Sequence, residues 1–288
     1  MDVTVARPRT RMRPSSWLRR VRGRAGFTFF LLAVLSPTIF VFLWWLSLSL
    51  KPDIDNTAYP PIFIPQHPTL VNFSHVFTDN PFALYTYNSL VVATASTILS
   101  LLFGVPAGYG IAKAKANGWA ILVLTSRMTP GLSYLIPWFM LFRFVGLNNT
   151  LWALIITHLV IGLPITIWVM IGFFEGLHPE LEEAALVDGC DIWGAFRHVA
   201  MPLSRPGIVV AAILSFIHSW NNFIFAVILA GQDTRTLPVA IFSMLNFNQF
   251  AWGDLAAAAL VVTLPVLVIT IVAQRQIIAG MTSGSIKG

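Results

Sequence analysis

Charged side chains are scarce in this 288-residue sequence. Asp, Glu, Lys and Arg together make up 10% of the residues, whereas 56% are hydrophobic. Soluble globular proteins carry about 25% charged residues. The deficit excludes an ordinary soluble domain and indicates a protein that crosses a membrane several times.

The sequence also lacks the motifs of hydrolytic and metal chemistry. Cys190 is the single cysteine, which excludes an internal disulfide and a cysteine–histidine zinc site. No Gly-x4-Gly-Lys-Ser/Thr phosphate loop and no His-Glu-x-x-His motif occur. We therefore expect no catalytic residue, no metal site and no cofactor bound by this chain.

The excess of basic residues is concentrated at one end of the chain. The net charge is +6, and eight of the fourteen arginines lie in the first 24 residues, ahead of a long apolar run. This placement is typical of the cytoplasmic flank of a membrane span, so nucleic acid is not an expected partner.

Six apolar segments are long enough to cross the hydrocarbon core, which takes about 20 helical residues. We expect an all-α membrane protein with six transmembrane helices. The predicted spans are Phe27–Leu50, Tyr85–Ala112, Trp119–Phe142, Leu151–Phe174, Ile208–Ala230 and Leu255–Ile278.

The distribution of Lys and Arg outside these spans indicates how the chain is oriented in the membrane. Fourteen fall on one side and only three, Lys51, Arg143 and Arg235, on the other. The positive-inside rule then places both termini in the cytoplasm. The predicted parts of the chain are a basic and disordered tail over 1–26, a first span with an outer segment over 27–84, a core transmembrane domain over 85–280 and a cytoplasmic tail over 281–288.

The loop over 175–207 is the longest polar interruption in the second half of the chain. Pro179 suits the first turn of a helix, and Gly189 suits the left-handed residue that closes it. Asp191 can cap a second helix, which Pro202 and Pro206 are expected to stop. The local signals predict two short helices joined by a tight turn.

The spacing Glu183-Ala184-Ala185, Gly189, then Val199-Ala200-Met201-Pro202 resembles the EAA loop of binding-protein-dependent ABC import permeases. The usual form ends Ile-x-Leu-Pro, so Val199 and Met201 depart from it conservatively. Asn88-Ser89-Leu90, Trp220-Asn221 and the ending Gly280 to Gly288 resemble the maltose-type, carbohydrate-uptake subgroup. The alternative for the loop is a plain solvated cytoplasmic hairpin.

The resemblance implies a type I importer permease (MetI-like) fold in the bacterial inner membrane. Its partners would be a second homologous permease, two ATPase subunits that hold ATP and Mg²⁺, an external substrate-binding protein and membrane lipid. The loop would be the coupling helix that docks on the ATPase. The residues carried over to that role are Glu182, Glu183, Ala184, Ala185, Asp188, Gly189 and Pro202.

Polar residues within the spans are candidates for contact with a carbohydrate. The strongest cluster is His218 to Asn222, because Trp220 offers a ring for the C–H face of a sugar and Asn221 and Asn222 offer amides. Trp220 would lie about 18 Å along its helix from Ile208, near mid-membrane. The alternative is that the asparagines join helices by hydrogen bonds.

Several other groups have an expected structural role. Asn88, another candidate for the pathway, also suits helix capping or packing. Gly104, Gly108 and Gly110 favour close helix packing. His158 is expected to be packed in the core, and Arg127 to snorkel to the inner surface or to pair with an acidic group of the loop or a partner.

Two other function classes account for the composition less well. An ion-coupled secondary transporter would show internal repeats or membrane-embedded acids, and neither is evident. A membrane enzyme would need a catalytic constellation, which is missing from this sequence. A scaffold would leave the EAA spacing unexplained. The resemblance to the importer family is therefore preferred, and it implies a permease subunit of an ATP-driven importer that takes up a sugar, polyol or glycoside.

Overall fold

The computed structural model describes residues 16–245 and 251–283, and within these ranges the fold is helical without strands. A helix satisfies its backbone hydrogen bonds within one segment, as a membrane span requires. Four apolar helices are long enough to cross the membrane without a break. They are α1 Ser16–Ser49, α4 Phe82–Lys113, α7 Leu151–Glu175 and α14 Trp252–Ser283.

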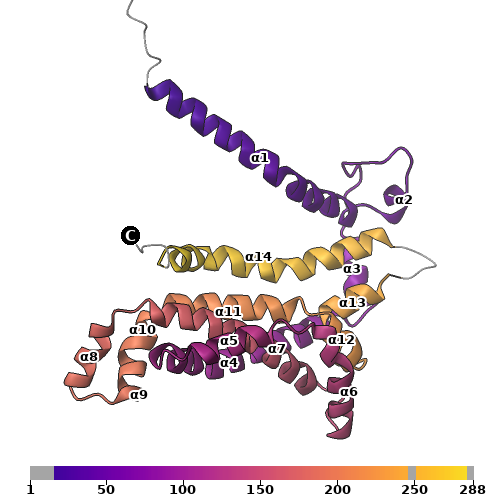
Figure 1. The fold of residues 1–288 in the computed structure, drawn as a ribbon. Coiled ribbons are helices and arrows are strands. Elements are labelled where there is room, and N and C mark those ends of the chain that lie inside the picture. Colours follow the sequence, from indigo (N-terminus) through magenta and orange to yellow (C-terminus); the bar gives the residue numbers. More distant parts are fainter. Residues whose placement is uncertain (1–15, 246–250, 284–288) are drawn as a thin grey trace, which may run out of the picture.

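Helices α4 and α7 pack along their length, with α11 Arg205–Trp220 against both (Figure 1). Gly104 and Gly108 lie on the α4 face that meets α7. A Cβ on Gly104 would lie 2.6 Å from Thr166 Cγ2, and one on Gly108 would lie 2.7 Å from Met170 Cβ. The predicted small-residue packing is confirmed for these two glycines, whereas Gly110 faces open space.

Two of the six predicted spans are not continuous helices. The segment expected over Trp119–Phe142 divides into α5 Asn117–Ser126, the 3-10 turn η1 Gly131–Tyr134 and α6 Leu135–Phe144. Pro130 precedes η1, and a proline removes a backbone donor and disfavours helical geometry in the residue before it. The prediction of one uninterrupted helix was wrong here.

The span expected over Ile208–Ala230 also breaks. Helix α11 ends at Trp220, and α12 Ile224–Leu229 begins after Phe223. Asn222 Oδ1 accepts from Phe225 N at 3.4 Å, so its side chain competes with the helical pattern. A fifth crossing is counted only if the bent pair Ile192–Leu203 and Arg205–Trp220, at 75°, forms one span.

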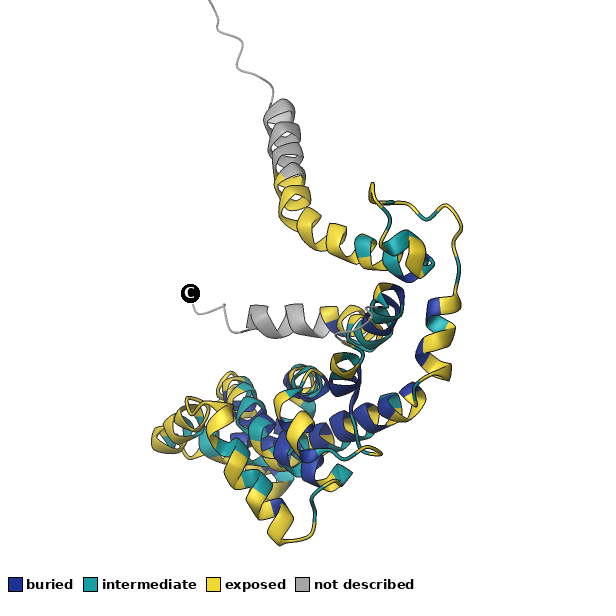
Figure 2. Cartoon of the chain, turned by 90° about the vertical axis from the view of Figure 1, so that its right-hand side faces the viewer, coloured by how far each residue is buried: buried dark blue, intermediate teal, exposed yellow. Residues whose placement is uncertain are grey.

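Helix α1 stands away from this bundle, and its main helix contact is with α14 (Figure 2). Its apolar side chains are exposed along most of the described length. The helix begins at Ser16, so the expected disordered tail is wrong for residues 16–26. Residues 1–15 and the tail after 283 lie outside the described residues.

The outer segment after α1 carries α2 Asp53–Asn56 and α3 Val71–Thr78. Lys51 is buried, and its Nζ donates to Ile62 O at 2.7 Å while lying 4.9 Å from the Trp44 ring centroid. Burial lowers the pKa of Lys51, and the Asp55 carboxylate opposes that shift. Asn72 Nδ2 donates to Ser49 O and Lys51 O at 2.9 and 2.7 Å.

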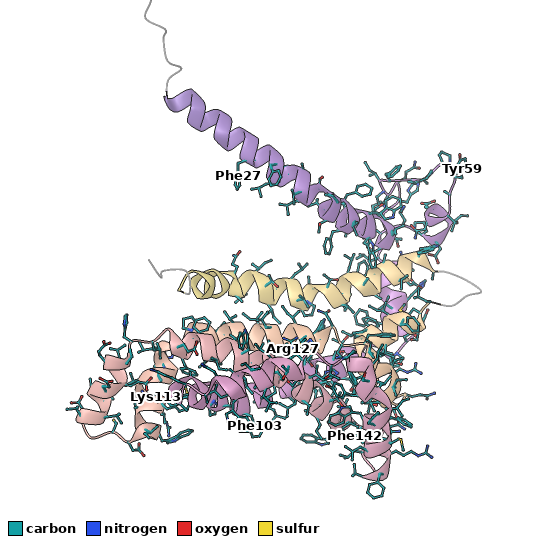
Figure 3. The ribbon with its side chains drawn as sticks, viewed as in Figure 1. Phe27, Tyr59, Phe103, Lys113, Arg127 and Phe142 are labelled. Atoms are coloured by element: carbon teal, nitrogen blue, oxygen red, sulfur yellow. The ribbon has the colours of Figure 1, made fainter. Side chains whose placement is uncertain are left out.

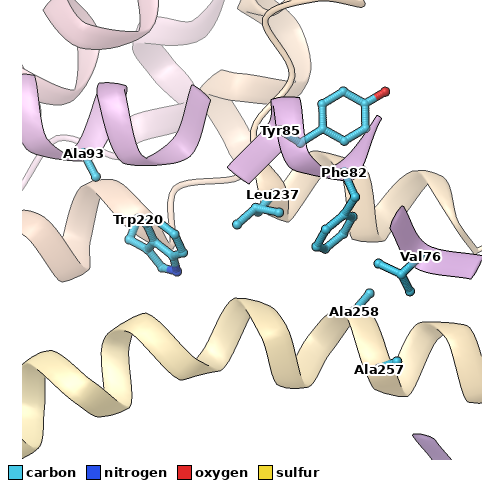
Figure 4. Close-up of a cluster of buried hydrophobic side chains, with 9 residues drawn as sticks. Val76, Phe82, Tyr85, Ala93, Trp220, Leu237, Ala257 and Ala258 are labelled. Carbon is cyan, nitrogen blue, oxygen red and sulfur yellow. The ribbon is translucent and has the colours of Figure 1, made fainter. Parts of the chain in front are cut away.

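Helix α3 joins the outer segment to the membrane domain. Val76 packs with Phe82, Ala257 and Ala258 in one buried cluster (Figure 4). Helix α3 of the outer segment thus packs on the membrane domain, whereas Tyr59 is 96% exposed and Ile64 81% exposed. The second outer loop, expected over residues 233–254, contains α13 Leu237–Ser243, in which Phe242 is exposed. Phe247 and Phe250 of this loop lie outside the described residues.

We predict that Gly108→Ala lowers the melting temperature of the protein, whereas Gly110→Ala does not. The new methyl group at 108 meets Met170 Cβ and the Ile167 carbonyl, so α4 and α7 must separate. Such overpacking costs about 1–3 kcal/mol. At 110 the methyl group meets nothing within 4 Å, and alanine favours the helix by up to about 1 kcal/mol. Thermal unfolding in detergent tests both, and equal melting temperatures would contradict the packing.

Candidate functional site

The polar loop forms a compact group of short helices at one end of the bundle (Figure 1). These are α8 Pro179–Val187, α9 Ile192–Ala195, the π-helical turn η2 Phe196–Ala200 and α10 Met201–Leu203. Pro179 lies in the first turn of α8, and Gly189 has a φ of 91°. Asp191 Oδ1 accepts from Gly194 N at 2.6 Å. The predicted first turn, left-handed glycine and cap are confirmed.

The second loop helix does not stop at Pro202 as predicted. It passes into η2, where Met201 N donates to Phe196 O, and then into α10. The wider π turn lies directly before Pro202, whose ring would clash with the carbonyl four residues earlier in a regular α-helix. The chain bends at Ser204, and Pro206 lies in the first turn of α11.

A buried ion pair fastens α8 to the membrane domain. Glu182 is only 6% exposed, and its Oε2 lies 2.8 Å from Lys113 Nζ. Tyr109 Oη donates to the same oxygen at 2.8 Å. Tyr109 and Lys113 are four residues apart on α4 and therefore project from one face of it. Motion of α8 is thereby tied to the C-terminal end of α4.

Aromatic rings extend this attachment to α7. The Tyr109 ring centroid lies 4.8 Å from that of Phe196 and 5.3 Å from that of Phe174. Trp193 lies 5.0 Å from Phe196. Because such contacts add to the burial of the rings, α4, α7 and the loop form one packed unit.

The other side of the loop is exposed. Glu183, Ala184, Asp188 and Gly189 are exposed there, and Pro202 is half-buried. Ala185 points inward with 8% exposure, as Glu182 does. Large apolar side chains share the exposed face: Leu181, Leu186, Val187, Ile192 and Trp193. We call these five residues the apolar tip; a surface of this kind, with acidic groups among it, suits a protein partner.

The predicted carbohydrate cluster does not line one surface. Trp220 is 1% exposed and points into the bundle, where its Nε1 donates to Val262 O of α14 at 3.1 Å (Figure 4). Asn222 Oδ1 accepts from Phe225 N in the first turn of α12, and His218 is half-buried. Asn221 alone of the cluster is exposed. Trp220 thus packs between helices, and its ring is not exposed for the contact with a sugar that the sequence predicted.

Asn88 is also engaged inside the protein. It is 2% exposed, and its Nδ2 donates to Asp233 O and Arg235 O at 2.8 and 2.9 Å. Ser89 Oγ accepts from Leu237 N at 2.8 Å. The Asn-Ser pair holds the second outer loop on α4.

Sequence reasoning missed a polar network inside the membrane. His158 Nδ1 of α7 lies 2.7 Å from Ser219 Oγ of α11, and Ser96 Oγ of α4 lies 3.0 Å from the same oxygen. The network joins the three central helices. His158 is a packed core histidine as predicted, but its partner was not evident because the two residues are 61 positions apart.

Comparison with known proteins agrees with this geometry. Residues 100–281 match the family model described as "Binding-protein-dependent transport system inner membrane component". The chain is 34% identical to the sulfoquinovosyl glycerol transport system permease protein SmoH of Agrobacterium fabrum, covering 87% of this chain and 89% of that protein. It is 36% identical to the trehalose transport system permease protein SugB of Mycobacterium tuberculosis, covering 85% and 91%.

A solved structure shares the fold. The chain resembles a subunit of a bacterial ABC transporter involved in the import of the acidic polysaccharide alginate, with a TM-score of 0.74. The match covers 92% of this chain and 99% of that one at 20% identity. The expected type I importer permease fold is confirmed, although the number of unbroken spans is smaller than predicted.

We predict that Glu182→Gln loosens α8, whereas Glu180→Gln, an exposed change on the same helix, does not. The neutral amide cannot balance Lys113, which is 42% exposed and therefore partly screened. The expected cost is about 1–2 kcal/mol. Hydrogen exchange over residues 179–187 should accelerate in Glu182→Gln alone. Unchanged exchange in that variant would show that the ion pair does not hold the helix.

Proposed function

The chain belongs to the binding-protein-dependent transport system inner membrane component family, and on that premise we propose the following assignment. It is the permease subunit of an ATP-driven ABC importer that carries a carbohydrate across the bacterial inner membrane. Membership of this family favours the importer over the ion-coupled alternative. The chain is a transport subunit, and ATP with Mg²⁺ would be held by ATPase partners.

One observation carries this proposal: the loop has an anchored side and a free side. Glu182 and the aromatic rings tie the loop to α4 and α7, while the apolar tip and Glu183 remain exposed. A segment built in this way can dock on a second protein and pass its movement into the membrane helices. This is what coupling to an ATPase requires.

The substrate class follows from the relatives. One is named for sulfoquinovosyl glycerol and another for trehalose, and the structural neighbour takes part in alginate import. These ligands share sugar rings and differ in charge. We therefore propose a sugar, polyol or glycoside as cargo, delivered by an external binding protein.

A second, homologous permease completes the pathway in this proposal. The chain leaves α1 exposed along most of its described length, and exposed apolar helices in a membrane can pack against lipid or another subunit. ATP binding would close two ATPase subunits, α8 would move with them, and the permease pair would rock between outward- and inward-open states. Both termini would lie in the cytoplasm.

We predict that Glu183→Lys abolishes coupling without unfolding the protein. The side chain is exposed, so the substitution costs little stability, but it reverses a charge beside the apolar tip. The complex of this chain with its partner permease, ATPases and binding protein would be assayed in nanodiscs. Sugar-stimulated ATPase activity and uptake should fall at least tenfold.

Asp79→Lys supplies the control, because Asp79 is an exposed acid at the end of α3 on the outer side. It should leave the association with the ATPase unchanged. Normal ATP-driven uptake by Glu183→Lys would remove the support for the coupling role of this loop.

A further inference from the structure

Two membrane segments of this chain break beside each other. The first break covers Arg127 to Pro130, between α5 and η1, and the second covers Asn221 to Phe223, between α11 and α12. A Cβ on Gly131 would lie 3.6 Å from the Phe225 ring, so the residues that follow the two breaks are in contact. Irregular backbone at membrane depth is tolerated only inside protein or along a watery cavity.

The length of α5 places Arg127 deep in the membrane. Helix α5 begins at Asn117, shortly after the cytoplasmic Lys113 and Lys115, and is ten residues long. At 1.5 Å per residue, Arg127 is about 15 Å along, near the middle of a core about 30 Å thick. The side chain is exposed on the surface of this chain. An arginine at that depth faces water or protein rather than lipid.

No acidic side chain in the described part of the chain forms an ion pair with Arg127. The ion pairs there join Lys113 to Glu182 and His75 to Asp254. Of the alternatives for Arg127, pairing with the buried loop carboxylate is wrong, because Lys113 takes it; pairing with an acid of a partner subunit stays a prediction. The sequence has no Asp or Glu over residues 116–174 or 205–232, which include both breaks.

Two histidines lie near the second break. His218 is on α11, three residues before Asn221, and His158 Nδ1 of α7 lies 2.7 Å from the Oγ of Ser219, the residue that follows His218. The Nε2 atoms of both histidines are buried and have no hydrogen-bond partner among the described residues. A buried polar atom without a partner is unfavourable. A water or a ligand hydroxyl at the second break would supply a partner to His218.

We propose that the paired breaks form a substrate contact and that Arg127 selects carbohydrates bearing an anionic group: a carboxylate, sulfonate or phosphate. This inference rests on the proposed importer function and names its substrate class. The guanidinium presents a planar fork of donors that matches such oxygens in pairs. The exposed amide of Asn221, at the second break, hydrogen-bonds the neutral hydroxyls. Figure 3 shows Arg127 on the ribbon, away from the cytoplasmic Lys113.

The test compares sugars that differ only in charge. Methyl glucuronide and methyl glucoside, and the matching galacturonide and galactoside, would be bound to the permease–ATPase complex in nanodiscs by equilibrium dialysis. The variants are Arg127→Gln and Arg127→Lys. Arg143→Gln is the matched control, because Arg143 is an exposed arginine at the end of α6.

The wild-type complex and Arg143→Gln should favour at least one acidic sugar over its neutral partner by tenfold or more. Arg127→Gln should remove this preference, and Arg127→Lys should keep part of it. No preference in the wild type, no binding of either acidic sugar, or a preference that survives Arg127→Gln would overturn the proposal. So would loss of the second permease from Arg127→Gln alone, which would make Arg127 half of an intersubunit ion pair.

ATP-driven uptake in the same nanodiscs separates this inference from the proposed function. Uptake of a carbohydrate delivered by the binding protein, without any acidic preference in the dialysis, would refute the role of Arg127 and leave the importer intact. Failure of the chain to co-purify with any ATPase would refute the importer itself.

Discussion

The contact between Glu182 and Lys113 is the constraint on which the working of this structure depends. A carboxylate that is 6% exposed must be paired, because an unbalanced buried charge is costly. Its partners, Lys113 and Tyr109, both belong to α4, so the requirement fixes the orientation of α8 against the membrane domain. Once that side is turned inward, Glu183 and the apolar tip must face outward.

The membrane helices are held by a few polar contacts and by close approach, since apolar side chains gain little by leaving lipid. Gly104 and Gly108 bring α4 onto α7, and Ser219 joins α11 to both through His158 and Ser96. Trp220 adds a bond to the α14 backbone. These contacts join α4, α7, α11 and α14 to one another.

The two breaks in the membrane helices form the surface that we propose contacts substrate. Inside a regular helix every backbone N–H and C=O is hydrogen-bonded within the segment. The breaks at Arg127 and Asn221 interrupt this hydrogen bonding at membrane depth. They lie beside each other and are free of acidic residues over the surrounding sequence. The same chain therefore combines a loop anchored to the C-terminal end of α4 with an irregular region at membrane depth that lacks acidic residues.

The sequence by itself determined what depends on neighbouring residues. The first-turn Pro179, the left-handed Gly189 and the Asp191 cap follow from local chemistry and were predicted correctly, and four of the six expected apolar spans are unbroken helices. Only the tertiary structure decided which of two adjacent glutamates is buried, that Trp220 faces the bundle and that Lys113 rather than Arg127 takes the loop carboxylate. Those outcomes depend on contacts between residues such as Tyr109 and Glu182, 73 positions apart, which no local pattern encodes.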